Sequence, residues 1–418
     1  MSEAAGRLDS GAIARDASAL VQVPSVTGDE RAALERLGEL AAALGLRPEL
    51  HRHDLGALRA HPEHPGEEAP RDELWGLTVT VPGTREGAPR LALDGHVDVV
   101  GAGTLPWAHG PWSGAVEDGF VHGRGSVDMK GGVVAALHAL AAVAAAGGGT
   151  APHGEVVLVA VGSEEDGGLG TFAALERDDR FDACLIPEAT GFDVVCAQAG
   201  ALTFEGVVRG VSAHAAHRLE GVSAIDRYLP VHAALAEHER RVNTGVEHEL
   251  MRALELPYPV LVGRLAAGEW SSQVPDRLRF EGRAPVRVGE PVAAARAAVE
   301  AAVAAATPPG GPPVELRWSG GQFASGETPT AHPFAQLVAR SVEAERGRPA
   351  RFAGVPWGAD MRLWTARGIP TVMAGTSGIE RAHAVDERVS IAELHTLARA
   401  IVRVIEGCAA MPVSPATR

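Results

Sequence analysis

Three consecutive acidic residues follow a run of apolar, β-branched residues in the first half of the chain. The run is "EVVLVAV" (155–161), and "GSEEDGG" after it supplies Glu164, Glu165 and Asp166. A short apolar run of this kind predicts a buried strand. Adjacent carboxylates repel one another at the end of such a strand, most strongly where water is partly excluded. These acids are therefore the first candidates for a functional site.

Other residues of the types that bind metals or move protons stand at predicted strand ends or in Gly-rich loops. They are His96 and Asp98 in "LALDGHVDVV", Asp128 in "GRGSVDMKGG", Glu188 in "LIPEAT" and His383 in "RAHAVDE". The carboxyl ends of the strands in an open α/β sheet line one crevice, so these side chains can converge. Each also has an ordinary explanation: His96 as a hydrogen-bonded strand-end histidine, Asp128 as a helix N-cap, and Glu188 as a surface acid.

Taken together, these side chains indicate a metal site. Two histidines and several carboxylates, without thiolates, suit Zn, Co or Mn in a site that activates water. Asp98 stands two residues after His96, so the two side chains point to the same face of a strand. The Asp98 carboxylate can therefore accept the second N–H of the imidazole, a common arrangement for metal-bound histidines.

The elements that must position these residues alternate between strand and helix. Apolar runs predict the strands, and helical periodicity or Ala-rich composition predicts the helices. The predicted strands are 75–81, 90–95, 155–161, 182–187 and 369–374, and the predicted helices are 10–45, 133–146, 168–177, 333–346, 360–367 and 391–406. This alternation predicts an α/β fold with a mostly parallel sheet and helices on both faces.

The pattern changes after Gly200. Between residues 200 and 319 the predicted order is strand, helix, strand, strand, helix, strand, which is the α+β, ferredoxin-like βαββαβ arrangement. We therefore expect one α/β domain, residues 1–199 and 320–418, interrupted by an inserted domain, residues 200–319. Residues 51–73 are rich in His, Pro and Glu, and they are predicted to form a solvated loop rather than a metal site.

Composition and charge argue against several functions. The 418 residues carry a net charge of −15, which argues against nucleic acid and anionic membranes as partners. The apolar run 133–146 is too short to cross a bilayer. The three cysteines form no CxxC motif, and residues 1–30 lack the pattern of a signal peptide. A cytoplasmic location with reduced thiols is therefore expected.

Several dispersed motifs together resemble one enzyme family. The motifs are "GHVD", "PWSGAVEDGFVHGRGSVDMKGG", "SEEDGG", "PEAT", "SAHAAH", "VPWGADMRL" and "AHAVDE". In order and spacing they closely resemble the M20 metallopeptidases, the group of acetylornithine deacetylase, succinyl-diaminopimelate desuccinylase, aminoacylase and carboxypeptidase G. The resemblance covers nearly the whole chain. It implies a zinc-exopeptidase-like catalytic domain that binds two divalent metal ions, Zn or else Co or Mn, and an inserted lid and dimerisation domain.

The resemblance also implies roles for the matching residues. Asp128 would bridge the two metals, and the peptide bond after it would be cis. One metal would also bind His96 and Glu188, and the other Glu165 and His383. Glu164 would act as general base and general acid while a metal-bridged hydroxide attacks the substrate.

Substrate contacts are implied for four further residues. His214 in "SAHAAH" matches a lid histidine that stabilises the oxyanion, often from the partner subunit of a homodimer. Arg283 in "RFEGRAPV" matches an arginine that binds a substrate carboxylate. Ser272 stands where the family usually has an asparagine, so contacts there differ in this chain. Gly358 in "WGAD" matches a backbone contact near the substrate.

The predicted function is metal-dependent hydrolysis of the amide bond of an N-acyl amino acid. An alternative within the same family is a dipeptidase or aminopeptidase, which would differ in the pocket that holds the free amine or the carboxylate. A catalytically silent binding protein on this fold is a further alternative. The loss of a metal ligand or of the general base would be the expected mark of such a protein, and none of these residues is missing.

Overall fold

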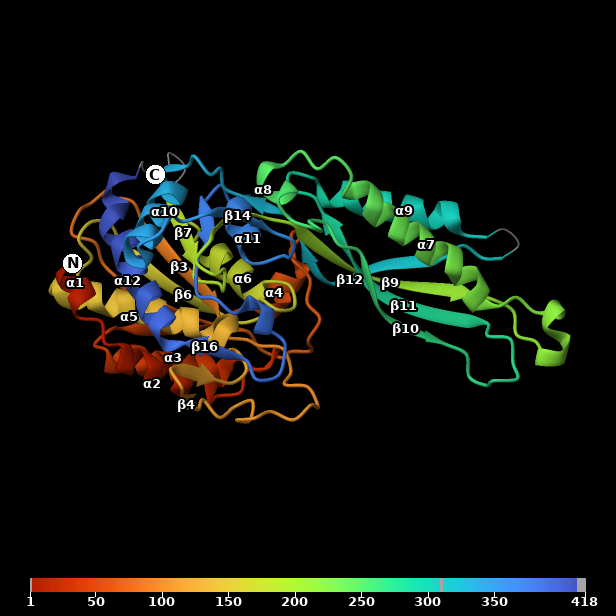
Figure 1. The fold of residues 1–418 in the computed structure, drawn as a ribbon, viewed down its shortest axis with the longest axis horizontal. Coiled ribbons are helices and arrows are strands. Elements are labelled where there is room, and N and C mark those ends of the chain that lie inside the picture. The colour runs from red at the N-terminus through yellow and green to blue at the C-terminus, as the bar shows by residue number, and fades with distance from the viewer. Residues whose placement is uncertain (1, 309–310, 412–418) are drawn as a thin grey trace.

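The computed structural model describes residues 2–308 and 311–411, and Figure 1 shows them folded into a large lobe and a smaller, elongated lobe. Residues 1, 309–310 and 412–418, which fall within the predicted domain ranges, lie outside the described residues. The large lobe holds a nine-stranded sheet, and the small lobe is built on a four-stranded sheet. A short three-stranded sheet completes the large lobe, in the order β16 (Arg388–Ser390), β5 (Phe120–His122) and β4 (Val116–Glu117).

The nine-stranded sheet has the order β1-β2-β6-β3-β7-β15-β8-β13, with β14 paired to β8. Its strands are β1 (Pro48–Arg52), β2 (Trp75–Val81), β3 (Leu91–His96), β6 (Val156–Val161), β7 (Ala183–Ile186), β8 (Val194–Gln198), β13 (Gly326–Glu327), β14 (Phe352–Val355) and β15 (Thr371–Met373). The predicted α/β class is confirmed. The parallel pairing that we expected holds for β6, β3, β7 and β15 in the centre.

Antiparallel pairing marks the margins of this sheet, so the sheet is mixed. Strand β2 runs antiparallel to both β1 and β6, and β13 runs antiparallel to β8. The physical reason at the first margin is the connection from β2 to β3. Residues 82–90 form it without a helix, whereas parallel strands need a crossover of a dozen or more residues.

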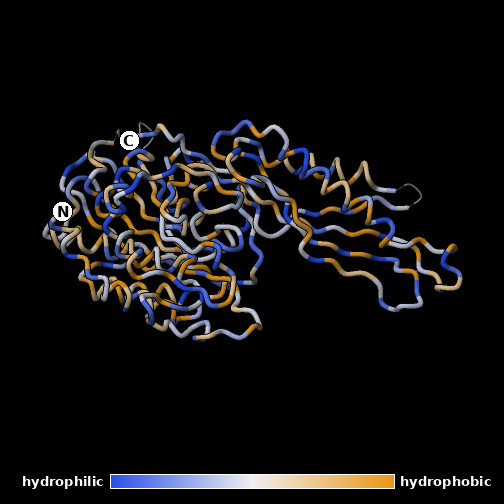
Figure 2. The backbone as a smooth tube through the Cα atoms, viewed as in Figure 1, coloured by the Kyte–Doolittle hydropathy of each residue, from blue (hydrophilic) through white to orange (hydrophobic). Residues whose placement is uncertain are grey.

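The centre of the large lobe is apolar on both sides of the sheet. Every residue of β3, β6 and β7 is buried, as continuous apolar runs in parallel strands predict. Helix α5 (Gly131–Ala146) packs against β3 and β6, and α6 (Leu169–Arg177) packs against β2 and β6 in a separate apolar cluster. Figure 2 shows hydrophobic residues running along the chain through the interior of this lobe.

One helical stretch among the described residues, Ser126–Ala146, is long and apolar enough to cross a membrane. However, 89% of its most apolar window is buried inside the protein. Helices α2 (Ser10–Val21) and α12 (Ile391–Gly407) pack against α5 and cover it. The stretch therefore has the environment of a core helix, as its Ala-rich composition predicts.

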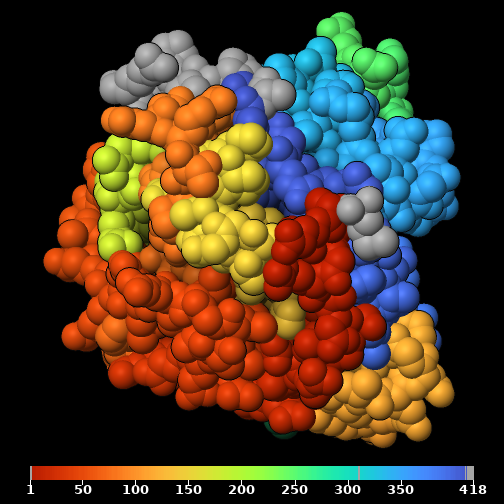
Figure 3. All heavy atoms as spheres, turned by 90° about the vertical axis from the view of Figure 1, so that its left-hand side faces the viewer, coloured from red at the N-terminus to blue at the C-terminus, as the bar shows by residue number. Residues whose placement is uncertain are grey.

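The two ends of the described chain meet in the large lobe, on the side away from the small lobe. Helix α1 (Glu3–Gly6) contacts both α5 and α12. Figure 3 shows the N-terminal segment, in red, beside C-terminal segments, in blue, on this face. The large lobe is thus built from residues on both sides of the small lobe.

The small lobe has the predicted order of elements. They are β9 (Gly200–Arg209), α7 (Ala224–Val242), β10 (Leu261–Ala267), β11 (Arg277–Val286), α9 (Val292–Ala306) and β12 (Glu315–Phe323), with a short α8 (Glu249–Arg252) after α7. All strand pairs are antiparallel, in the order β10-β11-β9-β12. The domain boundaries stay a prediction; β12 extends past residue 319 to Phe323 and still pairs there with β9 of the small lobe.

Two stretches differ locally from the prediction. The predicted helix 10–45 is two helices, α2 and α3 (Arg31–Ala43), separated by a break in which Ser25 donates to the Val97 main-chain oxygen at 2.6 Å. The predicted loop 51–73 contains α4 (Leu55–Ala60), whose first turn is capped by the side chain of Asp54. The break between α2 and α3 also contains Pro24 and Gly28, which has φ +102°, and such residues end helices whatever the apolar periodicity around them.

Candidate metal centre

Three neighbouring parallel strands bring most of the candidate residues together. His96 is the last residue of β3, Glu164 and Glu165 follow β6, and Glu188 follows β7. Strand β3 lies between β6 and β7, so the carboxyl ends of all three open at the same edge of the sheet. The convergence that we expected from the strand ends is therefore present in the structure.

Asp128 enters the same place from the turn before α5. Its peptide bond to Met129 is cis, as the resemblance implied. The turn is held by Glu387, whose carboxylate accepts hydrogen bonds from the main-chain nitrogens of Val127 at 2.9 Å and Asp128 at 3.3 Å. Arg124 pairs with the other oxygen of Glu387 at 2.6 Å. Glu387 thus fixes the backbone from which the Asp128 carboxylate projects.

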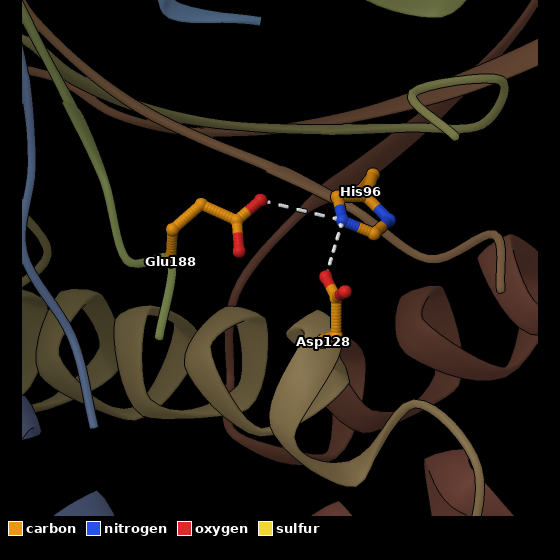
Figure 4. A group of neighbouring side chains, drawn as sticks. All are labelled: His96, Asp128 and Glu188. Carbon is orange, nitrogen blue, oxygen red and sulfur yellow. Dashed lines mark hydrogen bonds and ion pairs between the residues drawn. The ribbon is translucent and has the colours of Figure 1, made fainter. Parts of the chain in front are cut away.

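The side chains form two triads that share Asp128, namely His96, Asp128 and Glu188, and Asp128, Glu165 and His383. The donor atoms of each triad lie within 4.8 Å of one another. His96 Nε2 lies 3.2 Å from Asp128 Oδ1 and 3.3 Å from Glu188 Oε1, and Figure 4 shows the imidazole facing both carboxylates. His383 Nε2 lies 3.3 Å from Asp128 Oδ2 and 3.1 Å from Glu165 Oε2.

Hydrogen bonding alone does not satisfy this arrangement. Each Nε2 carries at most one hydrogen, yet each faces two carboxylates. In His96 the other ring nitrogen, Nδ1, donates to the Asp98 main-chain oxygen at 2.9 Å, which favours a lone pair on Nε2. A lone pair and two carboxylate oxygens that point at one place are the donors of a cation site.

The spacing of the donors also fits a metal ion. Zinc bonds to histidine nitrogen and carboxylate oxygen are about 2.0–2.2 Å long, which puts tetrahedral ligands roughly 3.3 Å apart. The four imidazole–carboxylate distances, 3.1–3.3 Å, match that spacing. The residues present therefore fit two divalent ions that share Asp128 as a bridging ligand.

The field inside the cluster is strongly negative. Burial would lower the pKa of His96, but the carboxylates of Asp128, Asp98 and Glu188 outweigh burial and raise it well above its usual value. The same kind of contact, with Asp128 and Glu165, raises the pKa of His383 to about 10. Both shifts have the direction that surrounding carboxylates impose, which is the environment that a cation site requires.

Glu164 and Glu165 differ in their surroundings although they are neighbours. Burial, with Asp128 nearby, raises the pKa of Glu165 to about 7, and contact with His383 opposes this shift. Burial raises the pKa of Glu164 well above its usual value, and Glu165 and Glu188 add to the shift. Glu164 belongs to neither triad. A carboxyl group with a raised pKa beside a metal site is suited to moving protons.

Asp98 contacts the cluster from behind. Its Oδ1 lies 3.4 Å from His96 Nδ1, but its shorter contacts are with the backbone of the acidic loop. The main-chain nitrogens of Glu164 and Glu165 each donate to an Asp98 oxygen at 3.1 Å, and Thr27 donates its hydroxyl at the same distance. Asp98 therefore orients both the imidazole of His96 and the loop that carries Glu164 and Glu165.

A pocket of 450 Å³ opens over the cluster at the boundary of the lobes. Glu164 and Asp128 form part of its floor, and Arg283 and Gly358 lie on its walls, so two of the residues predicted to contact substrate lie at the pocket, and the contacts themselves stay a prediction. The rest of the lining is largely apolar and includes Pro259, Leu261, Phe323 and Trp357. Among the described residues that line it, Arg283 is the one arginine or lysine.

His214 and Ser272 do not reach this pocket within one chain. Both are exposed, and they lie beside each other, since Ala215 N donates to the Ser272 main-chain oxygen at 3.0 Å. Neither residue lines the pocket. The structure does not bring them to the pocket of their own chain, and their contacts with substrate stay a prediction.

The sequence analysis did not predict two residues that support the cluster. Glu387 holds the Asp128 turn, and Thr27 holds Asp98. Glu387 stands four residues after His383 in the same motif, "AHAVDE", which is the signal that could have found it. No local signal marks Thr27, because its role depends on a contact between the break after α2 and the end of β3.

Comparison with known proteins agrees with this geometry. The model of Peptidase family M20/M25/M40 matches residues 92–407. A succinyl-diaminopimelate desuccinylase of Rhodopseudomonas palustris (strain BisA53) is 30% identical over an alignment of length 405 that covers 93% of this chain and 95% of that protein.

Two solved structures share the fold. A tripeptidase from Staphylococcus aureus superposes with a TM-score of 0.73 at 22% identity, covering 96% of this chain and 99% of the other. A dinuclear metal-binding peptidase from the M20 family of Bacillus subtilis superposes with a TM-score of 0.63 at 16% identity, covering 95% and 98%. Both alignments span the large lobe and the small lobe, so known structures contain the same two-lobed fold.

Proposed function

The chain belongs to peptidase family M20/M25/M40, and from this membership and the geometry of its metal centre we propose that it hydrolyses the amide bond of N-acyl amino acids with two divalent metal ions, most simply Zn, with Co or Mn as substitutes. The family makes it a metal-dependent hydrolase of linear amides. The observation that carries the proposal is the pair of triads that share Asp128, with Glu164 beside them.

The residues of the chain have distinct tasks in this reaction. His96, Glu188, Glu165 and His383 hold the ions together with Asp128, and the ions, when bound, polarise the amide carbonyl and acidify a water. Glu164 accepts the proton that this water loses. The same carboxyl then gives the proton to the leaving amine, so one group serves both steps. Asp98 keeps Glu164 in place through its main-chain nitrogen.

The pocket supports a substrate that has one carboxylate near the scissile amide. Arg283 is suited to pair with such a carboxylate, since a guanidinium binds it through two parallel hydrogen bonds. Gly358 leaves its backbone accessible on the same pocket wall. The apolar residues of the lining, such as Phe323 and Trp357, suit a hydrophobic acyl group or side chain.

A substrate panel tests this proposal. We expect protein supplied with Zn, Co or Mn to hydrolyse at least one compound among N-acetyl, N-formyl, N-succinyl and N-carbamoyl amino acids. Arg283→Ala should raise KM roughly 10- to 100-fold, the range expected for a lost charged hydrogen bond, and should change kcat little. Release of the free amino acid is measured at a series of substrate concentrations.

The matched control for Arg283 is Arg209→Ala. Arg209 stands on the neighbouring strand β9, which is paired on both sides within the sheet, and it pairs with Glu315 at 2.8 Å on the exposed surface, so its loss should leave KM unchanged. Cleavage of dipeptides alone would favour the dipeptidase alternative. Failure of the metal-loaded protein to hydrolyse any compound would favour a binding protein.

We further propose a homodimer formed through the small lobe, in which His214 completes the pocket of the partner. The support is the position of His214 outside the pocket of its own chain, together with the edge strand β10. This strand exposes Leu261 and Leu265, and an unpaired edge with apolar residues favours pairing with another chain.

Mixing two inactive variants tests the dimer. His214→Ala and Glu164→Gln chains are each expected to be inactive alone. If His214 acts in the partner's site, random exchange gives one complete site in each mixed dimer, hence about a quarter of the wild-type activity. No recovery in a sample whose subunit exchange has been demonstrated, for example by mass spectrometry, would contradict the proposal.

The cysteines support a reducing compartment. Cys184, Cys196 and Cys408 are free and buried. Free thiols without a disulfide partner are usual in the cytosol, where glutathione and thioredoxin keep cysteines reduced. We therefore propose a cytoplasmic location.

A further inference from the structure

The segment Pro65–Arg71, which we call the strap, lies between the loop that carries Glu164 and the small lobe. It follows α4, at the boundary between the lobes in Figure 1. Its first residue, Pro65, accepts a hydrogen bond from Gln322 N of β12 at 2.9 Å. Composition alone would place this Pro- and Glu-rich segment in solvent, yet parts of it are firmly held.

Close backbone contacts surround Gly66. A Cβ atom at Gly66 would lie 2.0 Å from the Gly320 oxygen, and one at Gly167 would lie 2.2 Å from the Gly66 oxygen. The strap is thus sandwiched between the acidic loop and β12 with no room for a side chain. Gly66 also has φ +87°, a conformation that glycine adopts without cost.

Asp166 links the acidic loop to the strap. Its carboxylate accepts two hydrogen bonds from Arg71 Nη2, at 2.8 and 3.0 Å, and one each from the main-chain nitrogens of Glu68, at 3.1 Å, and Ala69, at 2.8 Å. The hydroxyl of Ser163 donates to the same carboxylate. A buried carboxylate with this many donors is firmly fixed.

Arg71 is an unusually buried cation, with 5% of its surface exposed. Besides Asp166, it faces Glu30 at 3.3 Å and Glu67 at 3.5 Å. A buried charge persists only when it is paired, and removing one partner is strongly destabilising. The contacts of Arg71 therefore form a permanent part of the structure.

The turn that Asp166 holds is the one that presents the two glutamates. Ser163 has φ +68°, which is uncommon for a residue other than glycine, and its hydroxyl bond to Asp166 stabilises this turn. On the other side, Asp98 binds the main-chain nitrogens of Glu164 and Glu165. The loop is thus held from two sides, by Asp98 and by Asp166.

The strap also contacts the small lobe through a side chain. Glu68 Oε1 accepts hydrogen bonds from the Thr203 hydroxyl at 3.0 Å and from Gly321 N at 3.1 Å. It lies 3.8 Å from Arg283 Nη2. The strap therefore touches, within a few residues, the acidic loop, two strands of the small lobe and the arginine on the pocket wall.

We propose that the strap is a positioning element for amide hydrolysis, which holds Glu164 and Glu165 in place through the Arg71–Asp166 pair. No strap residue lines the pocket or belongs to either triad, so the strap acts through the loop. This inference rests on the proposed function, because it assigns its effect to the placement of the proton-transfer group and of a metal ligand. A shift of about 1 Å in such groups can lower turnover on the order of 100-fold.

Asp166→Asn tests the proposal, because it keeps the shape of the side chain and removes the charge and one acceptor. At saturating metal, with metal content measured, we expect kcat to fall roughly 10- to 100-fold while KM changes less than about threefold. Hydrogen exchange should become faster in peptides that cover residues 162–168 and 65–71. Arg71→Lys keeps the buried charge but not the planar guanidinium that bonds to both oxygens of Asp166, and it should show a smaller effect of the same kind.

The matched control is Asp178→Asn. Asp178 pairs with Arg90 at 2.8 Å and with Arg180 at 2.9 Å, away from the pocket, so its loss tests a general effect on stability. This control should keep kcat and normal exchange in both segments. Native kcat and native exchange in folded Asp166→Asn would overturn the role of the strap. A wild-type protein without amidase activity would instead contradict the proposed function, and the exchange result would still show whether the strap holds the loop.

Discussion

Glu164→Gln should lower kcat at least about 100-fold and leave both metal ions bound. Glutamine keeps the size of the side chain and its capacity for hydrogen bonds, but it does not take up a proton. General acid–base catalysis typically contributes about 10²–10⁴-fold, and here one carboxyl group would serve both steps. Steady-state kinetics and metal analysis of the same preparation measure the two quantities.

Glu165→Gln provides the contrast, because the two glutamates are adjacent and of identical type. Glu165 Oε2 lies 3.1 Å from His383 Nε2 within a triad, whereas Glu164 belongs to neither triad. Loss of Glu165 should therefore lower metal occupancy and, through it, activity. A Glu164→Gln protein with near-native kcat would remove the proposed mechanism, and one that had lost its metals would show that the two roles are reversed.

Metal removal should abolish activity. The two triads place carboxylate oxygens and imidazole nitrogens 3.1–3.3 Å apart around Asp128. Once the ions are removed, the side chains of the triads do not supply the positive charge that polarises an amide carbonyl. Dialysis against a strong chelator should leave protein without measurable turnover. Addition of Zn or Co should restore activity, with up to two ions bound per chain.

Thermal unfolding gives a second readout that does not depend on catalysis. Ions that bind the folded state alone raise its stability, and here they would also relieve repulsion among Asp128, Glu165 and Glu188. The metal-free protein should therefore have a lower Tm than the reconstituted protein. Chelator already saturated with Zn is the control and should have no effect. Metal-free protein with full activity would refute the proposal.

The sequence by itself determined the fold class and the set of residues at the metal centre. The apolar runs that became β3, β6 and β7 are continuous because both faces of these strands are buried, and this pattern is legible without coordinates. Parallel strands open their carboxyl ends on one edge, so residues after each run had to meet there. The βαββαβ order of the small lobe was legible for the same reason, since strand and helix periods differ.

Only the tertiary structure decided how these residues are held. Periodicity reports which face of an element is buried, but it does not report which polar atom meets which. Three contacts are therefore visible only in the tertiary structure. They are the contact of each histidine Nε2 with a second carboxylate, the hydrogen bonds that the acidic loop donates to Asp98, and the hydrogen bonds through which Glu387 holds the Asp128 turn. The strap is the clearest case. Its Pro- and Glu-rich sequence is typical of a solvated loop, and it is held instead by long-range contacts, chiefly those of Arg71 with Asp166 and Glu30, that join residues distant in the chain.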